Sequence, residues 1–104
     1  MRRGEIRWYA FEKPDKKRPV LVLTRDAAIE YLGELTVAPT TTKIRNIPTE
    51  VILTEDDGMP ELCCINVDHL QTVSKHQIGS LITTLDEFKL RQVRQAILFA
   101  FGFS

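Results

Sequence analysis

Hydrophobic and polar residues alternate at the start of the chain, in short runs that end at turn residues. Within residues 5–11, Ile6, Trp8 and Ala10 fall on one face, which predicts a half-buried strand. Residues 19–24 form a β-branched apolar run that begins at a proline and is bounded by charged residues. This run predicts a buried central strand with the proline at its entry.

The middle of the chain continues with short elements. Residues 26–32 predict a short helical turn, capped by Asp26 and ending at Gly33. Further strands are expected over residues 35–38 (ending at Pro39), 49–53, 62–66, 70–74 and 78–82. These strands are too closely spaced for the long crossovers that a parallel sheet needs.

The last segment changes to a helical period. Thr84 and Glu87 match a capping box, and Gly102 stands where a helix would end. Between them, hydrophobic residues recur at helical spacing: Leu90, Val93, Ile97 and Phe101. Phe99 and Phe103 lie away from this stripe, so the helix buries a second face, either in a dimer or within one chain. The whole pattern predicts a mainly β protein, a small and strongly bent barrel or sheet with one C-terminal helix.

Length and composition narrow the class. At 104 residues, with 43% hydrophobic and 27% charged residues, the chain is expected to form a single domain over residues 1–104. It has neither an apolar run of membrane-spanning length nor the core of a signal peptide, so we expect a cytosolic protein. The adjacent Cys63 and Cys64 are expected to be reduced and at least partly buried, because neighbouring cysteines pair only with strain.

Charge is balanced overall but unevenly distributed. The chain has 14 basic and 14 acidic residues, and most of the basic ones precede residue 51. The sharpest basic cluster is Lys13, Lys16, Lys17 and Arg18. A solvated surface loop is the ordinary interpretation of such a cluster, so charge alone predicts no nucleic-acid partner.

Two sets of residues could carry chemistry. His69 and His76 could act as general acid and base, although nothing in their spacing brings them together. Alternatively, Arg18 opens a buried strand and residues 39–42 (Pro-Thr-Thr-Thr) end one, so a guanidinium and a threonine hydroxyl could face the same phosphate. RNA carries its own nucleophile, the 2′-hydroxyl, so its cleavage needs only positioning and charge stabilisation, without a metal.

Five short motifs, in order and with compatible spacing, resemble the MazF/PemK family of toxin endoribonucleases. They are residues 3–6 (Arg-Gly-Glu-Ile), 18–23 (Arg-Pro-Val-Leu-Val-Leu), 37–42 (Val-x-Pro-x-Thr-Thr), 47–51 (Ile-Pro-Thr-Glu-Val) and 66–73 (Asn-Val-Asp-His-Leu-Gln-Thr-Val). The resemblance implies an SH3-like barrel, a homodimer and cleavage of single-stranded RNA to 2′,3′-cyclic phosphate and 5′-hydroxyl ends. It also implies an antitoxin protein as partner, and neither a metal nor another cofactor.

The resemblance carries residue roles as well. Arg18 matches the family's catalytic arginine and Thr41 its catalytic threonine, with Thr42 as the fallback if the register slips by one. Thr40, Thr42 and Lys43 flank this threonine and are candidate RNA contacts. The loop before Arg18 is shorter than is usual in the family, so Lys16 and Lys17 are expected to contact phosphates. His69 is a possible base contact.

Two other functions stay open. CcdB-type toxins share this barrel but poison a topoisomerase without catalysis, and they use the end of the C-terminal helix. The apolar tail of residues 97–104 is compatible with such a role. An inactive relative that binds RNA without cutting it is the third possibility, because fold alone does not decide between these activities.

Overall fold

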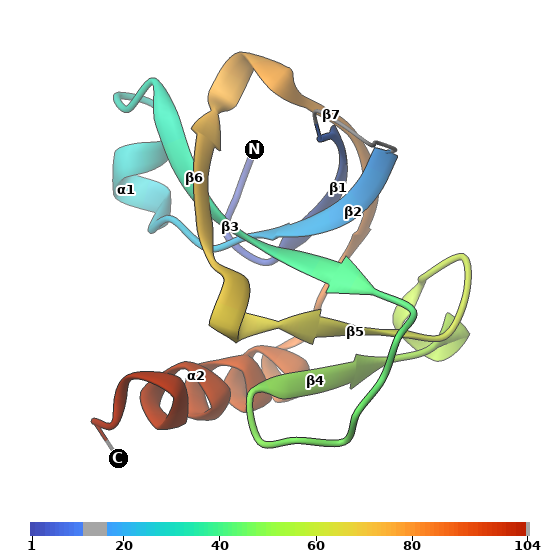
Figure 1. Cartoon of the computed structure of the whole chain (residues 1–104). Helices are drawn as coiled ribbons and strands as arrows, with labels where there is room; N and C mark the ends of the chain where they lie inside the picture. Colours follow the sequence, from blue (N-terminus) through green and yellow to red (C-terminus); the bar gives the residue numbers. More distant parts are fainter. Residues whose placement is uncertain (12–16, 104) are drawn as a thin grey trace.

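A computed structural model of the chain describes residues 1–11 and 17–103. In this part of the chain, seven antiparallel strands form one strongly bent, barrel-like sheet, with helix α2 (Glu87–Phe101) below it (Figure 1). The strands are β1 (Glu5–Ala10), β2 (Lys17–Val22), β3 (Glu34–Thr41), β4 (Glu50–Leu53), β5 (Cys63–Asn66), β6 (Gln71–Ser74) and β7 (Ile78–Thr84). Short helical segments connect them: α1 (Asp26–Ile29), η1 (Glu55–Asp57), η2 (Val67–His69) and η3 (Lys75–Gln77). The predicted mainly β fold with a C-terminal helix is confirmed.

Strand β3 is the centre of the sheet. Its Val37 pairs with Val22 of β2 on one edge and with Gln71 of β6 on the other. Beyond Pro39 the pairing with β2 ends, and Thr40 and Thr41 pair with β5 on the edge of β3 that β6 also uses. The path through the sheet is therefore β4-β5-β3-β2-β1-β7, with β6 following β5 along the same edge of β3.

All seven expected strands are present, but several boundaries were predicted wrongly. β2 starts at Lys17, so Pro19 lies inside the strand and not at its entry, and β7 continues to Thr84. We expected the strand of residues 35–38 to stop at Pro39, whereas β3 runs on to Thr41. Proline interrupts a strand because it lacks an N–H for the ladder. Here Pro39 stands where β3 changes partner, so the missing donor falls at a natural break between two pairings.

Both predicted N-terminal helix caps were also wrong, and so was the predicted end of the first helix. Helix α1 has Arg25 as its N-cap and ends at Ile29, well before Gly33. The carboxylate of Asp26 instead accepts a hydrogen bond from the backbone N–H of Arg3 at 2.7 Å. Helix α2 starts after Asp86, whose Oδ1 accepts from the N–H of Lys89 at 2.9 Å, because β7 occupies the chain as far as Thr84.

Two hydrophobic clusters lie on either side of the central strands. Side chains alternate between the two faces of β2. Leu21 packs in the cluster between the sheet and α2, whereas Val20 and Val22 pack in the cluster near α1. The predicted burial of this strand on both faces is therefore confirmed. Cys63 and Cys64 are free and buried, as expected.

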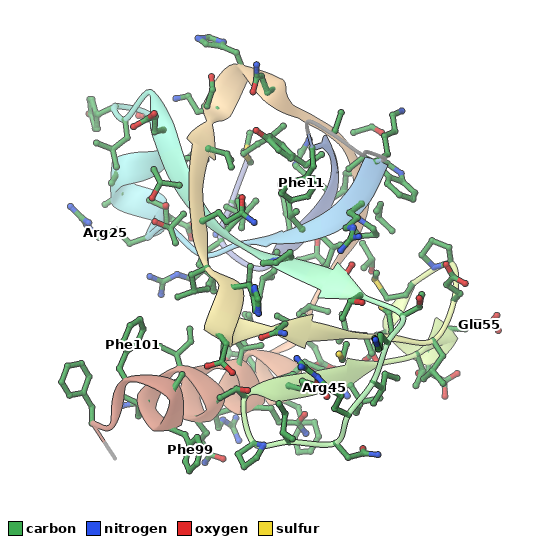
Figure 2. The ribbon with its side chains drawn as sticks, viewed as in Figure 1. Phe11, Arg25, Arg45, Glu55, Phe99 and Phe101 are labelled. Carbon is green, nitrogen blue, oxygen red and sulfur yellow. The ribbon has the colours of Figure 1, made fainter. Side chains whose placement is uncertain are left out.

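The C-terminal helix buries less than its pattern predicted. Val93 and Ala96 are buried against β4 and η2, but Phe101 of the expected stripe is 58% exposed. Phe99 is 54% exposed, and Figure 2 shows the two rings leaving the end of α2 on opposite sides. Gly102 ends the helix with φ of 74°, as predicted. Among the helices of residues 1–11 and 17–103, none combines the length and the apolar character needed to cross a bilayer.

Candidate active site

A groove opens where β2 and β3 part. The two strands pair only as far as Val20 and Pro39, after which β3 turns to β5 and the start of β2 pairs with β1 alone. The loop between β4 and β5 lies on the same side of the molecule as these strand ends (Figure 1). The space between these segments has a volume of about 410 Å³. We call it the β2–β3 groove.

Polar and apolar residues line different parts of the β2–β3 groove. The start of β2 and the end of β3 contribute Lys17, Arg18, Thr40, Thr41 and Thr42. Strand β1 and the β4–β5 loop contribute Trp8, Met59, Pro60 and Glu61, with Pro19 and Cys63 between the two sets. The groove thus combines cations and hydroxyls with a wall that is apolar at Trp8, Met59 and Pro60 and carries the carboxylate of Glu61.

Arg18 stands in the groove on a fixed scaffold. It lies in β2 opposite Tyr9 of β1, and its side chain is exposed. No ion pair joins Arg18 to a carboxylate within residues 1–11 and 17–103. With respect to the described residues, its guanidinium can meet an anionic ligand, to which it offers paired N–H donors.

The neighbouring threonines differ in their contacts. Thr40 is 2% exposed, and its hydroxyl donates to the backbone oxygen of Pro19 at 2.9 Å, which ties β3 to β2. The Oγ1 of Thr41 accepts from the backbone N–H of Lys43 at 3.1 Å, so its hydroxyl hydrogen remains available to donate. Thr42 is exposed. Thr41 and Thr42 can therefore meet a ligand, whereas the hydroxyl of Thr40 already has a partner.

The other residues singled out from the sequence lie elsewhere. Lys16 falls outside the described residues, and the exposed Lys43 follows the groove threonines without lining the groove. His69 in η2 and His76 in η3 lie at opposite ends of β6, so the structure does not bring the histidine pair together. Lys17, Arg18 and the three threonines are the predicted residues that the structure does bring together.

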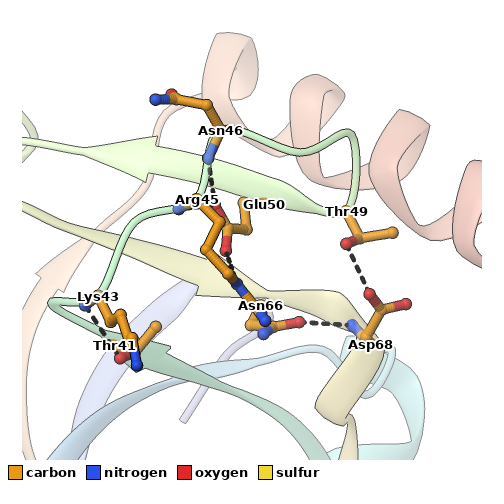
Figure 3. Close-up of polar contacts among 8 residues, drawn as sticks. All are labelled: Thr41, Lys43, Arg45, Asn46, Thr49, Glu50, Asn66 and Asp68. Atoms are coloured by element: carbon orange, nitrogen blue, oxygen red, sulfur yellow. Dashed lines mark hydrogen bonds and ion pairs between the residues drawn. The ribbon is translucent and has the colours of Figure 1, made fainter.

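The loop after Thr42 is held by a carboxylate that the sequence did not reveal (Figure 3). The side chain of Glu50 is fully buried. It accepts from the backbone N–H groups of Arg45 and Asn46, each at 2.9 Å, and from Nε of Arg45 at 3.2 Å. Burial alone would raise the pKa of Glu50, but these hydrogen bonds and the Arg45 charge together hold it below its usual value. Asn46 adopts φ of 57°, which asparagine tolerates better than most residues. The sequence signals none of this, because Glu50 looks like an ordinary strand residue.

A second polar network fixes the chain next to this loop. Thr49 donates its hydroxyl to Asp68 at 2.6 Å, and the backbone N–H of Asp68 donates to Asn66 at 2.9 Å. Figure 3 shows both networks beside Thr41 and Lys43. The loop that follows the groove threonines is therefore anchored at its far end.

The apolar wall of the groove was also missed from the sequence. The β4–β5 loop that supplies Met59 to Glu61 is tied down by Thr83, whose hydroxyl donates to the backbone oxygen of Asp57 at 2.9 Å. Lys89 of α2 donates to the backbone oxygen of Ile52 at 2.7 Å and lies 3.7 Å from the Asp57 carboxylate. These ties join residues far apart in the sequence. The one signal that could have found the wall is Trp8, the single tryptophan of the chain.

Taken together, the bent sheet, the C-terminal helix and the groove define a small β-barrel domain with a cationic, hydroxyl-bearing site at its rim. A family model described as "PemK-like, MazF-like toxin of type II toxin-antitoxin system" matches residues 2–101. The chain belongs to this family of toxins.

Related proteins agree with this assignment. The chain is similar to the probable endoribonuclease MazF5 of Mycobacterium tuberculosis (strain ATCC 25618 / H37Rv), at 35% identity over 96 residues, covering 91% of this chain and 87% of the relative. It is equally similar to the probable endoribonuclease MazF2 of the same strain, at 35% identity over 98 residues, covering 93% and 94%.

Solved structures share the fold. The Mycobacterium tuberculosis toxin MazF-mt6 superposes with a TM-score of 0.88 at 31% identity, covering 96% of this chain and 98% of that one. A mycobacterial endoribonuclease in complex with its cognate antitoxin superposes with a TM-score of 0.90 at 20% identity, covering 100% and 97%. At that identity the likeness concerns the fold alone.

Proposed function

We propose that this toxin is an endoribonuclease that cuts single-stranded RNA at a short sequence without a metal ion. The observation that supports the proposal most directly is that Arg18 and Thr41 line one groove, in the part of the chain where β2 and β3 separate. The names of its relatives, which are endoribonucleases, support the same activity.

The proposed reaction is an internal transfer at phosphorus. The RNA 2′-oxygen forms a bond to phosphorus while the bond from phosphorus to the 5′-oxygen breaks, leaving a 2′,3′-cyclic phosphate and a 5′-hydroxyl. The 2′-hydroxyl gives up its proton and the leaving 5′-oxygen gains one. Charge builds on the phosphoryl oxygens between these events, so preorganised donors aimed at them lower the barrier.

Arg18 and Thr41 have different parts in this scheme. Guanidinium groups keep their proton in proteins, so Arg18 stabilises the charged phosphorane and does not act as a base. Thr41 donates its hydroxyl to the phosphate or orients the attacking oxygen. Thr42, Lys16, Lys17 and Lys43 contact neighbouring phosphates, which adds salt-sensitive affinity without sequence preference.

Two predicted contacts take more limited roles. Because the hydroxyl of Thr40 is bonded to Pro19, we assign Thr40 to shaping the groove next to the RNA. His69 lies outside the groove, so any contact it makes is to a base beyond the cleaved phosphate.

The proposal includes partners. Structures similar in fold include MazE–MazF complexes from Deinococcus radiodurans, and we propose an antitoxin protein for this chain as well. We also propose a homodimer, which would cover part of the exposed apolar end of α2 around Phe99 and Phe101. The proposed site of action is the cytoplasm, where the RNA is found.

Purified protein tests the activity directly. In the presence of EDTA it should cut an unstructured RNA and leave cyclic phosphate ends. Arg18→Ala should lower kcat/KM by about 100-fold or more, and Thr41→Val, which removes the hydroxyl at similar volume, should also lower it strongly. Arg25→Ala is the matched control, because Arg25 is exposed beside α1 on the far side from the groove (Figure 2). A requirement for added magnesium, or full activity of Arg18→Ala, would contradict the proposal.

A topoisomerase poison is not favoured. The matching relatives are named endoribonucleases, and a poison of the CcdB type has no need of the rim arginine. Expression in cells separates the two functions. Arg18→Ala should abolish toxicity; if it stays fully toxic while removal of residues 97–104 abolishes toxicity, the poison is the correct function.

A further inference from the structure

Trp8 stands in the β2–β3 groove without a role in the core. It lies in β1 and is only partly buried. Its neighbour Tyr9 packs against Phe11 with ring centroids 4.8 Å apart, and both rings contact the hydrophobic cluster near α1. Within the described residues, Trp8 is part of neither hydrophobic cluster. Because the Trp8 ring does not pack in either cluster, it is available to contact a ligand.

Trp8 lies where β1 pairs regularly with β2 but irregularly with β7. The pairing of β1 with β7 shifts register between Ile6 and Arg7 and again between Arg7 and Tyr9. Each shift places an extra residue on β7, so the bulges belong to β7 while β1 itself stays regular. Bulges are common next to active sites.

Gly79 of β7 lies close to the Trp8 backbone. A Cβ at position 79 would lie 3.1 Å from the backbone oxygen of Trp8 and 3.7 Å from its Cβ. The glycine therefore lets β7 pass close behind the tryptophan. Trp8 is held on a rigid strand and not on a mobile loop, which suits a surface that must receive a flat ligand.

The surroundings of Trp8 match the two halves of a nucleotide. Pro19, Met59 and Pro60 extend the apolar wall, and Arg18 with Thr41 supplies donors for a phosphate. The groove volume of about 410 Å³ falls within the usual range for sites that hold small ligands. A nucleobase offers a flat π face of the size that aromatic side chains bind in single-stranded nucleic acids.

We propose that Trp8 stacks on a nucleobase of single-stranded RNA, adjacent to the phosphate bound by Arg18 and Thr41. This inference rests on the proposed nuclease function and adds a base-binding position to it. Stacking accepts every base to some degree, so Trp8 provides affinity and fixes the strand in place, while hydrogen bonds elsewhere select the sequence.

Trp8 is itself the probe for the test, because the chain has one tryptophan. The wild-type protein is titrated with an RNA made uncleavable by 2′-O-methyl groups, and the tryptophan fluorescence is followed. A second titration uses an oligonucleotide of the same length and charge in which the bases are removed. Stacking predicts saturable quenching by the first and little quenching, with about tenfold weaker binding, by the second. Equal binding of the two, or no change in fluorescence on binding, would overturn the inference.

Variants give an independent check. Trp8→Leu should weaken binding of the uncleavable RNA about tenfold and raise KM more than it lowers kcat, whereas Trp8→Phe should keep most of the affinity. Tyr31→Leu is the matched control, because Tyr31 is 82% exposed just after α1 and lies outside the groove. Far-ultraviolet circular dichroism confirms folding of each variant. Unchanged affinity in a folded Trp8→Leu variant would refute stacking.

The outcome also distinguishes this inference from the proposed function. If RNA quenches Trp8 but Arg18→Ala still cuts RNA, stacking stands and the assigned catalytic role is wrong. If cutting depends on Arg18 but base removal changes neither binding nor fluorescence, catalysis stands and stacking is wrong. Quenching by an antitoxin peptide but not by RNA would also contradict a nucleobase at this position.

Discussion

Replacing Glu50 with alanine should destabilise the protein strongly, although Glu50 lies outside the groove. Its carboxylate accepts two backbone N–H groups and the Nε of Arg45, and its side chain is fully buried. Removing it leaves the donors of Arg45 and Asn46 without their acceptor and ends the anchoring of the loop after Thr42.

The size of the loss follows from these contacts. Hydrogen bonds to a charged group contribute about 1.5–3 kcal/mol each, and removing one partner of a buried pair costs about 3–5 kcal/mol. The side chain of Arg45 is 53% exposed, so water can replace its ion pair, and the two backbone donors account for most of the loss. We therefore expect Glu50→Ala to lower the free energy of unfolding by about 3 kcal/mol. Glu50→Gln keeps one acceptor oxygen and should lower it by about half as much.

Urea unfolding at several pH values is the assay. The pKa of Glu50 is lower in the folded protein than its ordinary value of 4.5, so the folded state favours the charged form. Its contribution is present above that value and is lost as the pH falls through the folded pKa. The wild-type protein should lose more stability on acidification than Glu50→Gln does.

Glu55→Gln is the control for Glu50→Gln. Glu55 is also acidic, but it is exposed on η1 (Figure 2). It should have little effect at any pH. A loss below about 1 kcal/mol in Glu50→Ala, or parallel pH curves for the wild type and Glu50→Gln, would refute the argument.

Two further predictions concern the wall of the groove. Gly58 has φ of 93°, and a Cβ there would lie 2.3 Å from Oγ1 of Thr83, so Gly58→Ala should break the Thr83–Asp57 hydrogen bond and lower the free energy of unfolding by about 2 kcal/mol. Urea unfolding measures this loss, and a fully stable variant would contradict the close packing. Burial raises the pKa of the Cys63 and Cys64 thiols to about 11, from an ordinary value of 9.0. The thiols of the unfolded chain ionise at lower pH than those of the folded protein, so the free energy of unfolding should fall as the pH rises between these two values. Cys63→Ala should show a smaller fall. Parallel curves of stability against pH for this variant and the wild type would contradict the prediction.

The local pattern of hydrophobic and polar residues was enough to predict that the strands exist, because alternating positions and short apolar runs reflect burial directly. It failed where tertiary pairing decides the outcome. The end of β3 depends on Pro39 lying at a change of partner, and the start of α2 depends on β7 keeping Thr84 in the sheet. The caps at Arg25 and Asp86 follow from such boundaries and could not be chosen from the sequence alone.

In the site, too, local pattern revealed some residues, and others depend on tertiary contacts. Arg18 and Thr41 were found because each stands at a strand end in a motif that resembles the toxin family, and the structure places them in one groove. Met59 was not found, because the β4–β5 loop reaches the groove only after Thr83 and Lys89 tie it down. Contacts between residues so far apart leave no local pattern.

The difference between Thr40 and Thr41 shows how the fold creates the site. Where β3 leaves β2, the backbone oxygen of Pro19 would lose its ladder partner, and buried carbonyls are rarely left unpaired. The hydroxyl of Thr40 supplies that hydrogen bond at 2.9 Å and is itself buried. Successive strand residues point in opposite directions, so Thr41 is free of this task and keeps a hydroxyl hydrogen for a ligand. Thr40 thus holds β3 to β2 at the point where the two strands part. The hydroxyl of Thr41 is left available for the chemistry that we propose.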